Sequence, residues 1–99
     1  MKQTSRTAEK VLDVLEVLLA NFAHGLTPGD IAKATGLDAS GVTRYIATLE
    51  QKGFAERITE TGRIRPSVRL AQRAMAILKS IDANRARLDE LTHRISTTL

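Results

Sequence analysis

Residues 26–65 constrain the fold of this chain more than any other segment, because signals that start and stop helices follow one another in it at short intervals. Thr27 can cap a helix whose first residue is Pro28, where the missing N–H costs no hydrogen bond. Gly36 can take the positive φ that ends this helix and turns the chain sharply, and Asp38 can cap a second helix. The segment therefore predicts two helices joined by a tight turn.

The second helix is predicted over residues 39–52, with one apolar face and one polar face. Its apolar residues recur at the spacing of a buried helical stripe, and they are Val42, Tyr45, Ile46 and Leu49. Gly53 then ends the helix. Residues 54–65 read as two short strands around a turn at 59–62, with Ile58 and Ile64 expected inward and the arginines outward. The order predicts a helix-turn-helix followed by a β-hairpin wing.

Such a unit usually binds DNA, because its second helix can enter the major groove and expose the residues between its buried ones. Arg44 is the best candidate for a bidentate contact with guanine, while Ser40 and Thr43 can hydrogen-bond a base edge or a phosphate. The wing arginines suit phosphates or a narrow minor groove, and the start of the first helix can hold a phosphate. The predicted DNA-binding residues are Thr27, Ala39, Ser40, Thr43, Arg44, Ala47, Thr48, Arg57, Arg63 and Arg65.

Gly41 lies in the first turn of this second helix and has two interpretations. Its missing side chain either lets the backbone approach a phosphate closely or is simply a small residue that the helix tolerates at a cost of ~1 kcal/mol.

The motifs DIAKATGL (30–37) and SGVTRYIATLEQKGFAER (40–57), with Leu70 after the wing, resemble the N-terminal DNA-binding domain of IclR-type bacterial transcription regulators. The resemblance covers residues 7–96. It implies a sequence-specific regulator that binds double-stranded DNA as a homodimer. The chain departs from the family at Gly41, where a threonine is usual, and it stops at Leu99. The resemblance therefore implies that the effector-binding domain is lacking and that no small-molecule effector binds within this chain.

An amphipathic helix is predicted before this unit, over residues 7–23. Its apolar residues share one helical face and are Ala8, Val11, Leu12, Leu15, Leu18, Leu19 and Phe22. Val14 and Val17 lie off that stripe and either widen the core face or contact a partner subunit. Gly25 is expected to end this region with a positive φ.

A helical tail is predicted over residues 67–97. Apolar residues recur in it at alternating spacings of four and three, as in a coiled coil, and form a seam of Leu70, Ala74, Ile77, Ile81, Asn84, Leu88, Leu91 and Ile95. A lone helix of this kind needs a cover for its stripe, either another subunit or its own domain. The first predicts a homodimer with Ile77, Ile81, Leu88, Leu91 and Ile95 as dimerisation residues. The resemblance adds an expected bend or break near residues 80–82, with Asp82 capping the second piece.

Composition narrows the functional classes. The net charge of +4 favours a polyanionic partner, and the absence of cysteine excludes disulfides and thiol chemistry. No apolar run of ~18 residues and no secretory leader is visible, so we expect a cytoplasmic, nucleoid-associated protein with no membrane contact. Two distant histidines, no phosphate-binding glycine loop and no metal-ligand spacing predict no enzyme, cofactor or metal site.

Together these patterns predict a mainly α chain with a small β-hairpin. Residues 1–66 form a winged helix-turn-helix DNA-binding domain, and residues 67–99 form a helical tail that is the dimerisation element. Two functions remain open. One is a sequence-specific regulator on an inverted repeat, with helix 39–52 in the major groove and wing 54–65 on the backbone or minor groove. The other is a winged-helix protein–protein interaction module that regulates a partner without reading DNA.

Overall fold

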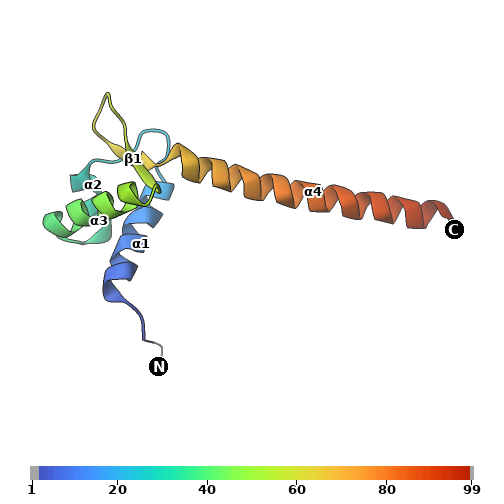
Figure 1. Ribbon diagram of the computed structural model, residues 1–99, viewed down its shortest axis with the longest axis horizontal. Helices are drawn as coiled ribbons and strands as arrows, with labels where there is room; N and C mark the ends of the chain where they lie inside the picture. The colour runs from blue at the N-terminus through green and yellow to red at the C-terminus, as the bar shows by residue number, and fades with distance from the viewer. Residues whose placement is uncertain (1–2, 99) are drawn as a thin grey trace.

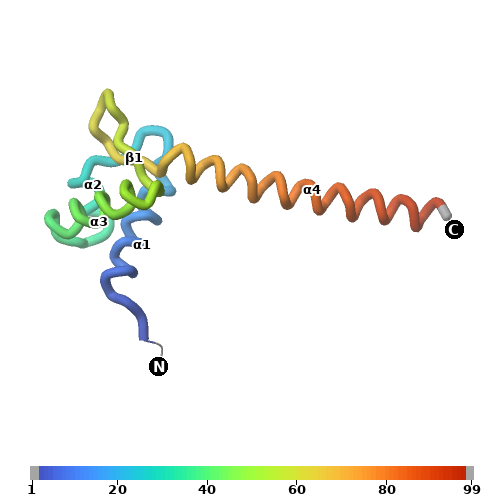
Figure 2. The backbone as a smooth tube through the Cα atoms, viewed as in Figure 1, coloured from blue at the N-terminus to red at the C-terminus, as the bar shows by residue number. Residues whose placement is uncertain are grey.

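The computed structural model describes residues 3–98, which form four helices and one two-stranded antiparallel sheet (Figure 1). The elements in chain order are α1 (Arg6–Leu19), α2 (Pro28–Thr35), α3 (Ala39–Gln51), β1 (Ala55–Arg57), β2 (Ile64–Pro66) and α4 (Val68–Thr98). Elements α1 to β2 pack into a head, whereas α4 projects from the head as a single rod (Figure 2). This arrangement confirms the predicted winged helix-turn-helix with a helical tail.

The projecting helix makes the molecule much longer than a compact chain of its size. The radius of gyration is 19.5 Å and the principal extents are 66 × 45 × 21 Å. A compact domain of this length would have a radius of gyration of about 13 Å. The head therefore contains nearly all of the packing.

The core lies where α1, α2 and α3 meet beside the hairpin. Each helix contributes buried apolar residues from one side. Buried apolar residues are Val14, Leu18, Ile31, Val42, Tyr45, Ile46, Leu49, Ala55 and Ile64. All four residues predicted for the inner face of α3 are in this set, so the amphipathic prediction for that helix is confirmed.

The prediction for α1 needs two corrections. The helix ends at Leu19 instead of Ala23, because the Asn21 side chain donates to the carbonyl of Val17 and the chain continues as turns to His24. The buried face also differs from the predicted stripe, since Val14 is fully buried. Four members of the predicted stripe are exposed instead: Ala8, Leu12, Leu19 and Phe22.

The helix-turn-helix follows its capping signals closely. Thr27 caps α2, and its hydroxyl accepts from the N–H of Asp30 at 3.0 Å while the Asp30 carboxylate accepts from the N–H of Thr27 at 3.2 Å. This reciprocal pair is a capping box. Gly36 ends α2 with φ of 74°, as predicted. Asp38 precedes α3 in an extended conformation, but its side chain makes no capping bond.

The wing is a short hairpin extended by one residue of a third segment. Its register pairs Ala55 with Pro66, Glu56 with Arg65, and Arg57 with Ile64. On the other side of β2, Leu26 and Ile64 exchange two backbone hydrogen bonds of 2.7 and 2.8 Å. Gly25 makes this approach possible, because it has φ of 69° and a Cβ there would lie 2.6 Å from the carbonyl oxygen of Ile64.

Helix α4 is continuous from Val68 to Thr98, so the expected break near residues 80–82 is wrong. Ser80 and Asp82 alone do not end a helix, and the sequence after Pro66 contains no glycine or proline to interrupt it. The alternative in which the tail folds back on its own domain is also wrong, because every residue from 72 to 97 is exposed.

None of the helices within residues 3–98 combines the length and the apolar character that crossing a membrane requires.

Candidate nucleic-acid interface

The outer face of α3 is the first part of the candidate interface. Packing of Val42, Ile46 and Leu49 against the other helices fixes the rotation of α3, so its opposite face is directed to solvent. All six residues predicted to contact DNA from this helix are exposed: Ala39, Ser40, Thr43, Arg44, Ala47 and Thr48. The structure thus brings these six predicted side chains together on one open surface.

Arg44 is the only cation among these six residues. Its guanidinium carbon lies 5.8 Å from the ring centroid of Tyr45, which is itself buried. Contact with an aromatic ring steadies the guanidinium while leaving its donors available. An open groove of about 280 Å³ adjoins it and is lined by Thr7, Val11, Arg44, Tyr45 and Thr48. A planar group with paired donors in this place suits the O6 and N7 acceptors of guanine.

The hydroxyl groups on this face are acceptors in their present conformation. Thr43 donates to the carbonyl of Ala39 at 3.1 Å, and Thr48 donates to the carbonyl of Arg44 at 3.0 Å. Ser40 donates to the Asp38 carboxylate at 2.9 Å. With their protons engaged, these oxygens can accept from the amino groups of adenine or cytosine, whereas a phosphate contact requires the hydroxyl to rotate.

Asp38 is a residue that the sequence analysis missed as part of this surface. It was read as a helix cap, but its carboxylate accepts from Ser40 instead and stays exposed at the start of α3. A carboxylate here can accept from cytosine N4 and repels phosphate. The sequence carries a signal for this arrangement, since the spacing Asp-x-Ser lets a serine hydroxyl compete for the carboxylate.

Gly41 is buried beneath this surface, at the start of α3. A Cβ at this position would lie 2.5 Å from Oδ1 of Asp38 and 3.3 Å from the Tyr45 ring. The nearest neighbour is therefore the end of a flexible side chain of the protein, which supports the reading of Gly41 as a small residue that leaves room for Asp38.

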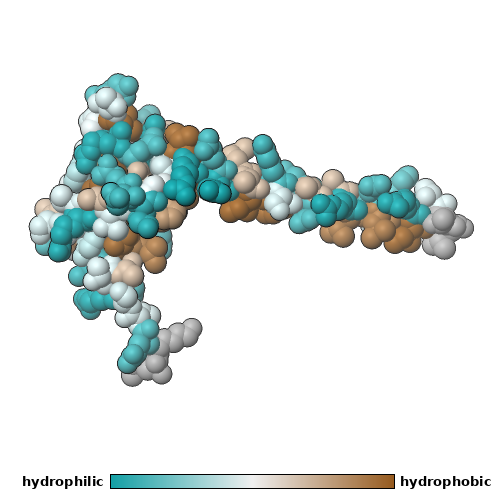
Figure 3. Space-filling view, viewed as in Figure 1, coloured by the Kyte–Doolittle hydropathy of each residue, from teal (hydrophilic) through white to brown (hydrophobic). Residues whose placement is uncertain are grey.

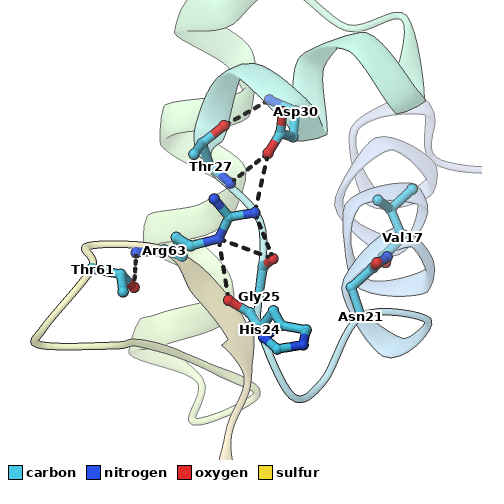
Figure 4. A network of polar contacts seen from close by, with 8 residues as sticks. All are labelled: Val17, Asn21, His24, Gly25, Thr27, Asp30, Thr61 and Arg63. Carbon is cyan, nitrogen blue, oxygen red and sulfur yellow. Dashed lines mark hydrogen bonds and ion pairs between the residues drawn. The ribbon is translucent and has the colours of Figure 1, made fainter.

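Arg63 of the wing is joined to the head by a network of polar contacts (Figure 4). Its guanidinium donates to the carbonyls of His24 and Gly25 at 3.2–3.3 Å and lies 3.6 Å from the Asp30 carboxylate. These contacts tie the wing to the turn after α1 and to the start of α2. Arg63 as a DNA contact stays a prediction, and the structure gives it a structural role as well.

Arg65 is engaged in a second network at the other end of the hairpin. Its guanidinium donates twice to Oε2 of Glu56, at 2.8 and 3.0 Å, and lies 5.8 Å from the Phe22 ring centroid. Oε1 of Glu56 accepts from the N–H of Val68, the first residue of α4. The bond from Val68, followed by that from Arg65, lowers the pKa of the Glu56 carboxyl. Arg65 as a phosphate contact likewise stays a prediction.

Arg57 is the most exposed of the three wing arginines, with half of its side chain open to solvent. Its face differs from the prediction, because pairing with Ile64 places the two side chains on the same side of the hairpin. There it donates to the carbonyl of Gly62 at 3.2 Å and lies 3.9 Å from Glu50 of α3. The ion pair is long and exposed, so it holds the guanidinium weakly.

The start of α2 was predicted to hold a phosphate. In the structure, the capping box of Thr27 and Asp30 occupies this place, and the hydrogen bonds from the backbone and hydroxyl of Thr27, helped by Arg63 and Lys33, lower the pKa of Asp30. A carboxylate kept ionised at a helix start competes with a phosphate for the same N–H groups. Thr27 as a DNA contact stays a prediction.

The predicted dimerisation residues form an apolar strip along α4. They are half to two-thirds exposed: Ile77 62%, Ile81 50%, Leu88 64%, Leu91 50% and Ile95 57%. Figure 3 shows apolar side chains gathered along one side of this helix in two groups. A groove of about 310 Å³ lies at the base of the helix, lined by Leu19, Phe22, Pro66, Leu70, Ala71, Ala74 and Met75.

Within residues 3–98, no three acidic or histidine side chains lie close enough together to hold a metal ion.

The architecture and the exposed face of α3 are those of a DNA-binding winged helix-turn-helix. The model of the IclR helix-turn-helix domain matches residues 7–58, which is more than half of the chain. The chain therefore belongs to the IclR helix-turn-helix family, a class of DNA-binding domain of transcription regulators.

A solved structure supports this assignment. The crystal structure of Pseudomonas aeruginosa HmgR is similar to this chain, with a TM-score of 0.66 and 29% sequence identity over 77% of the chain. The chain spans 31% of the length of that protein. Among curated protein sequences, none matches significantly.

Proposed function

We propose that this chain is a sequence-specific regulator of transcription that binds double-stranded DNA as a homodimer on an inverted repeat. The observation that carries the proposal is the open face of α3, where Arg44 stands among small and hydroxyl-bearing residues. A face of this composition fits against base edges without steric conflict. The net charge of +4 favours the phosphate backbone in addition.

The proposal assigns different tasks to α3 and the wing. Helix α3 (Ala39–Gln51) enters the major groove, where Arg44 reads guanine and Ser40 and Thr43 accept from base amino groups. The wing, over residues 54–65, lies on the backbone or minor groove with Arg57 as its most available cation. Arg63 and Arg65 also contact the DNA where a phosphate competes with their carboxylate partners, Asp30 and Glu56.

The proposal requires two half-sites because one head can recognise only a few base pairs. A single DNA-binding module buries only ~600–1,000 Å² of protein surface, and α3 offers one strong base-reading side chain. A dimer doubles these contacts and makes the second contact effectively intramolecular. The two α3 helices should meet successive major grooves ~10 base pairs apart, or a multiple of that spacing.

Selection of bound sequences from a random DNA pool tests this function. We expect an inverted repeat from the wild type, and we expect Arg44→Ala to relax the choice at one base pair in each half-site, a loss of ~1–3 kcal/mol. Lys79→Ala is a matched control, since it removes one positive charge from α4 rather than from α3. A pool that returns no enriched sequence would overturn sequence-specific binding.

A second experiment tests the paired half-sites. Inserting about five base pairs between the half-sites of a selected operator rotates one of them by about half a helical turn. Affinity should fall towards the value for one half-site and partly recover with about ten inserted base pairs. Unchanged affinity across the series would show that the chain binds as independent monomers.

The alternative is a winged-helix module that regulates a partner protein without reading DNA. The internal bonds of Arg63 and Arg65 favour it, because an adaptor needs these arginines only for its own fold. Binding to bulk DNA at low salt separates the two functions. A regulator should bind there and lose affinity steadily as salt rises, whereas an adaptor should not bind.

A further inference from the structure

The strip of exposed apolar residues on α4 leaves open how a second copy would cover it. Residues of the seam repeat with a period of 3.5, so Leu70, Ile77, Asn84 and Leu91 occupy the d positions of a heptad and Ala74, Ile81, Leu88 and Ile95 the a positions. A helix with this period is complementary to another copy of itself, because its a and d side chains fit the spaces between the same side chains of the copy.

We infer that two copies of the chain pair their α4 helices in parallel and in register, with Asn84 opposite Asn84 of the partner subunit. This inference rests on the proposed homodimer and adds its direction and alignment. Two features of α4 carry it: the single polar residue in the seam and the charges that flank the seam.

Asn84 distinguishes parallel from antiparallel pairing. In a parallel pair in register, a d residue faces the same residue of the other helix, so two Asn84 side chains meet and each amide can donate to the carbonyl oxygen of the other. In an antiparallel pair, d faces a. All four a residues are apolar, so every antiparallel register leaves the Asn84 amide against an apolar side chain, which costs free energy when it is buried.

The charged residues beside the seam also favour parallel over antiparallel pairing. The g positions, on one side of the seam, are Arg73, Ser80, Arg87 and Arg94. Antiparallel helices place g opposite g, and in the register with Asn84 facing Ile81 this brings Arg73 against Arg94 of the partner subunit. Arg94 already has an acidic neighbour, Glu90 at 3.5 Å, so the repulsion is partly offset. Like charges held together still oppose the pairing.

Parallel helices place g opposite the e position of the next heptad, and this arrangement removes the repulsion between arginines. The e positions are Ala71, Leu78, Arg85 and Thr92. Arg73 then faces Leu78 of the partner subunit, Ser80 faces Arg85, and Arg87 faces Thr92, so no arginine meets another. The side of the helix that carries Asp82 and Asp89 also turns towards the arginine row of the other copy, which is favourable at long range.

Parallel pairing puts both heads at the same end of the paired helices. The two α3 helices are then related by a two-fold axis along α4, which is the symmetry of an inverted repeat. An antiparallel pair would place the heads at opposite ends of a rod about 46 Å long, since α4 has 31 residues at ~1.5 Å each.

Single cysteines test the direction, because the chain contains none of its own. Leu91→Cys and Ile77→Cys each place one thiol at a d position, and Ala86→Cys places one at the outer f position as the control. In the parallel pair, facing d residues come within the Cα–Cα range of a disulfide, ~4.4–6.8 Å. In the antiparallel register with Asn84 facing Ile81, two Leu91 residues are about 25 Å apart at ~1.5 Å per residue.

Under mild oxidation we expect Leu91→Cys and Ile77→Cys to form disulfide-linked dimers at least tenfold faster than Ala86→Cys. Sedimentation of the reduced variants establishes that each is a dimer and that the substitution has not prevented folding. A dimeric mass without cross-linking of Leu91→Cys would overturn the parallel direction. Cross-linking of Leu91→Cys with Ala74→Cys, in a mixture of the two, would identify the antiparallel pair instead.

A monomeric mass for the wild type would overturn the inference. So would a complex in which an acidic helix of another protein, and not a second copy of this chain, covers α4. Asn84→Leu provides an independent readout. It should raise the midpoint of thermal unfolding of the dimer and lower the cross-linking yield of Leu91→Cys in the same chain, because alternative registers become accessible. An unchanged yield would show that Asn84 does not set the register.

The DNA-binding proposal is measured separately, as the affinity of the reduced wild type for a selected operator. A chain that cross-links as expected but fails to bind DNA refutes the proposed function and leaves the parallel pair intact. A chain that binds the inverted repeat but does not cross-link at Leu91 refutes the parallel pair alone.

Discussion

The head and α4 use apolar residues in opposite ways. In the head, Leu18, Ile31 and Val42 are fully buried, and each lies among residues from other elements. In α4, Leu88 is 64% exposed and no other segment of residues 3–98 covers it. The two regions have comparably regular apolar patterns, so the difference does not lie in the pattern. It lies in whether the chain itself supplies the opposite surface.

This contrast shows that one chain can combine a self-sufficient fold with an incomplete one. The head buries the apolar face of α3 and part of the apolar residues of α1 and α2 within residues 6–66, so we expect it to fold without a partner. Helix α4 exposes a stripe that would be worth ~1.5–3 kcal/mol for each large side chain once buried. Its stability is therefore expected to depend on protein concentration, whereas that of the head is not.

The largest expected effect comes from a cavity in the head. Leu18→Ala should destabilise the protein by ~2–5 kcal/mol, because Leu18 is fully buried in the core. Leu88→Ala removes the same atoms from α4 and should leave unfolding of the head unchanged. Urea unfolding monitored through Tyr45 measures both. Equal losses of unfolding free energy for the two variants would show that Leu88 contributes to the head as much as Leu18 does.

The next effect concerns the partner of α4. Leu91→Asp should raise the dissociation constant of the dimer at least tenfold and reduce helical circular dichroism at low micromolar concentration, because it places an unpaired charge in the seam. His93→Asp is the control, since this residue lies at the outer f position. A clean monomer already for the wild type would show that the helix has no second copy as its cover.

A smaller effect separates the wing arginines. Arg63→Ala should cost about 1–3 kcal/mol of stability, since it leaves the carbonyls of His24 and Gly25 without their donor. Arg57→Ala should leave stability nearly unchanged but reduce the salt dependence of DNA binding by about one unit of slope. Thermal unfolding and binding at several salt concentrations measure the two. The reverse pattern would assign the DNA contact to Arg63.

The smallest effect is a dependence on pH that should be confined to the head. Hydrogen bonds lower the pKa of Asp30 and Glu56 in the folded state. The stability they provide is present above the ordinary carboxyl pKa of about 4 and is lost as the pH falls through and below it. Asp30→Asn and Glu56→Gln should each flatten the acid side of a plot of melting temperature against pH. An unchanged plot would show that these carboxylates do not contribute.

The sequence predicted the helix-turn-helix well because its signals are local. The caps at Thr27 and Gly36 act within one turn of the chain, and the buried residues of α3 follow from the helical period alone. The exposed residues of α3 that are predicted to contact DNA follow by exclusion from that same period. Local chemistry therefore sufficed for both the helix and the face that carries the candidate site.

Features that depend on distant partners were not predictable in this way. The bridge of Leu26 to Ile64 joins residues far apart in the chain, and it brings the carbonyl of Gly25 within reach of Arg63. The inward rotation of Val14 in α1 also depends on where α2 and α3 lie. The expected break in α4 came from family resemblance rather than from a glycine or proline, and the structure shows a continuous helix.

The anchoring of α4 at its base has a mechanical consequence. Ser67 donates to the carbonyl of Gly53 at 2.7 Å and accepts from the N–H of Leu70, while Glu56 holds the N–H of Val68. These bonds form a short hinge between the head and a lever of 31 residues. A rotation of only about 5° at this hinge displaces the far end of a ~46 Å arm by about 4 Å. In the proposed pair, two helices that stay in contact along the seam therefore require this hinge to hold the angle between the head and α4 to within a few degrees.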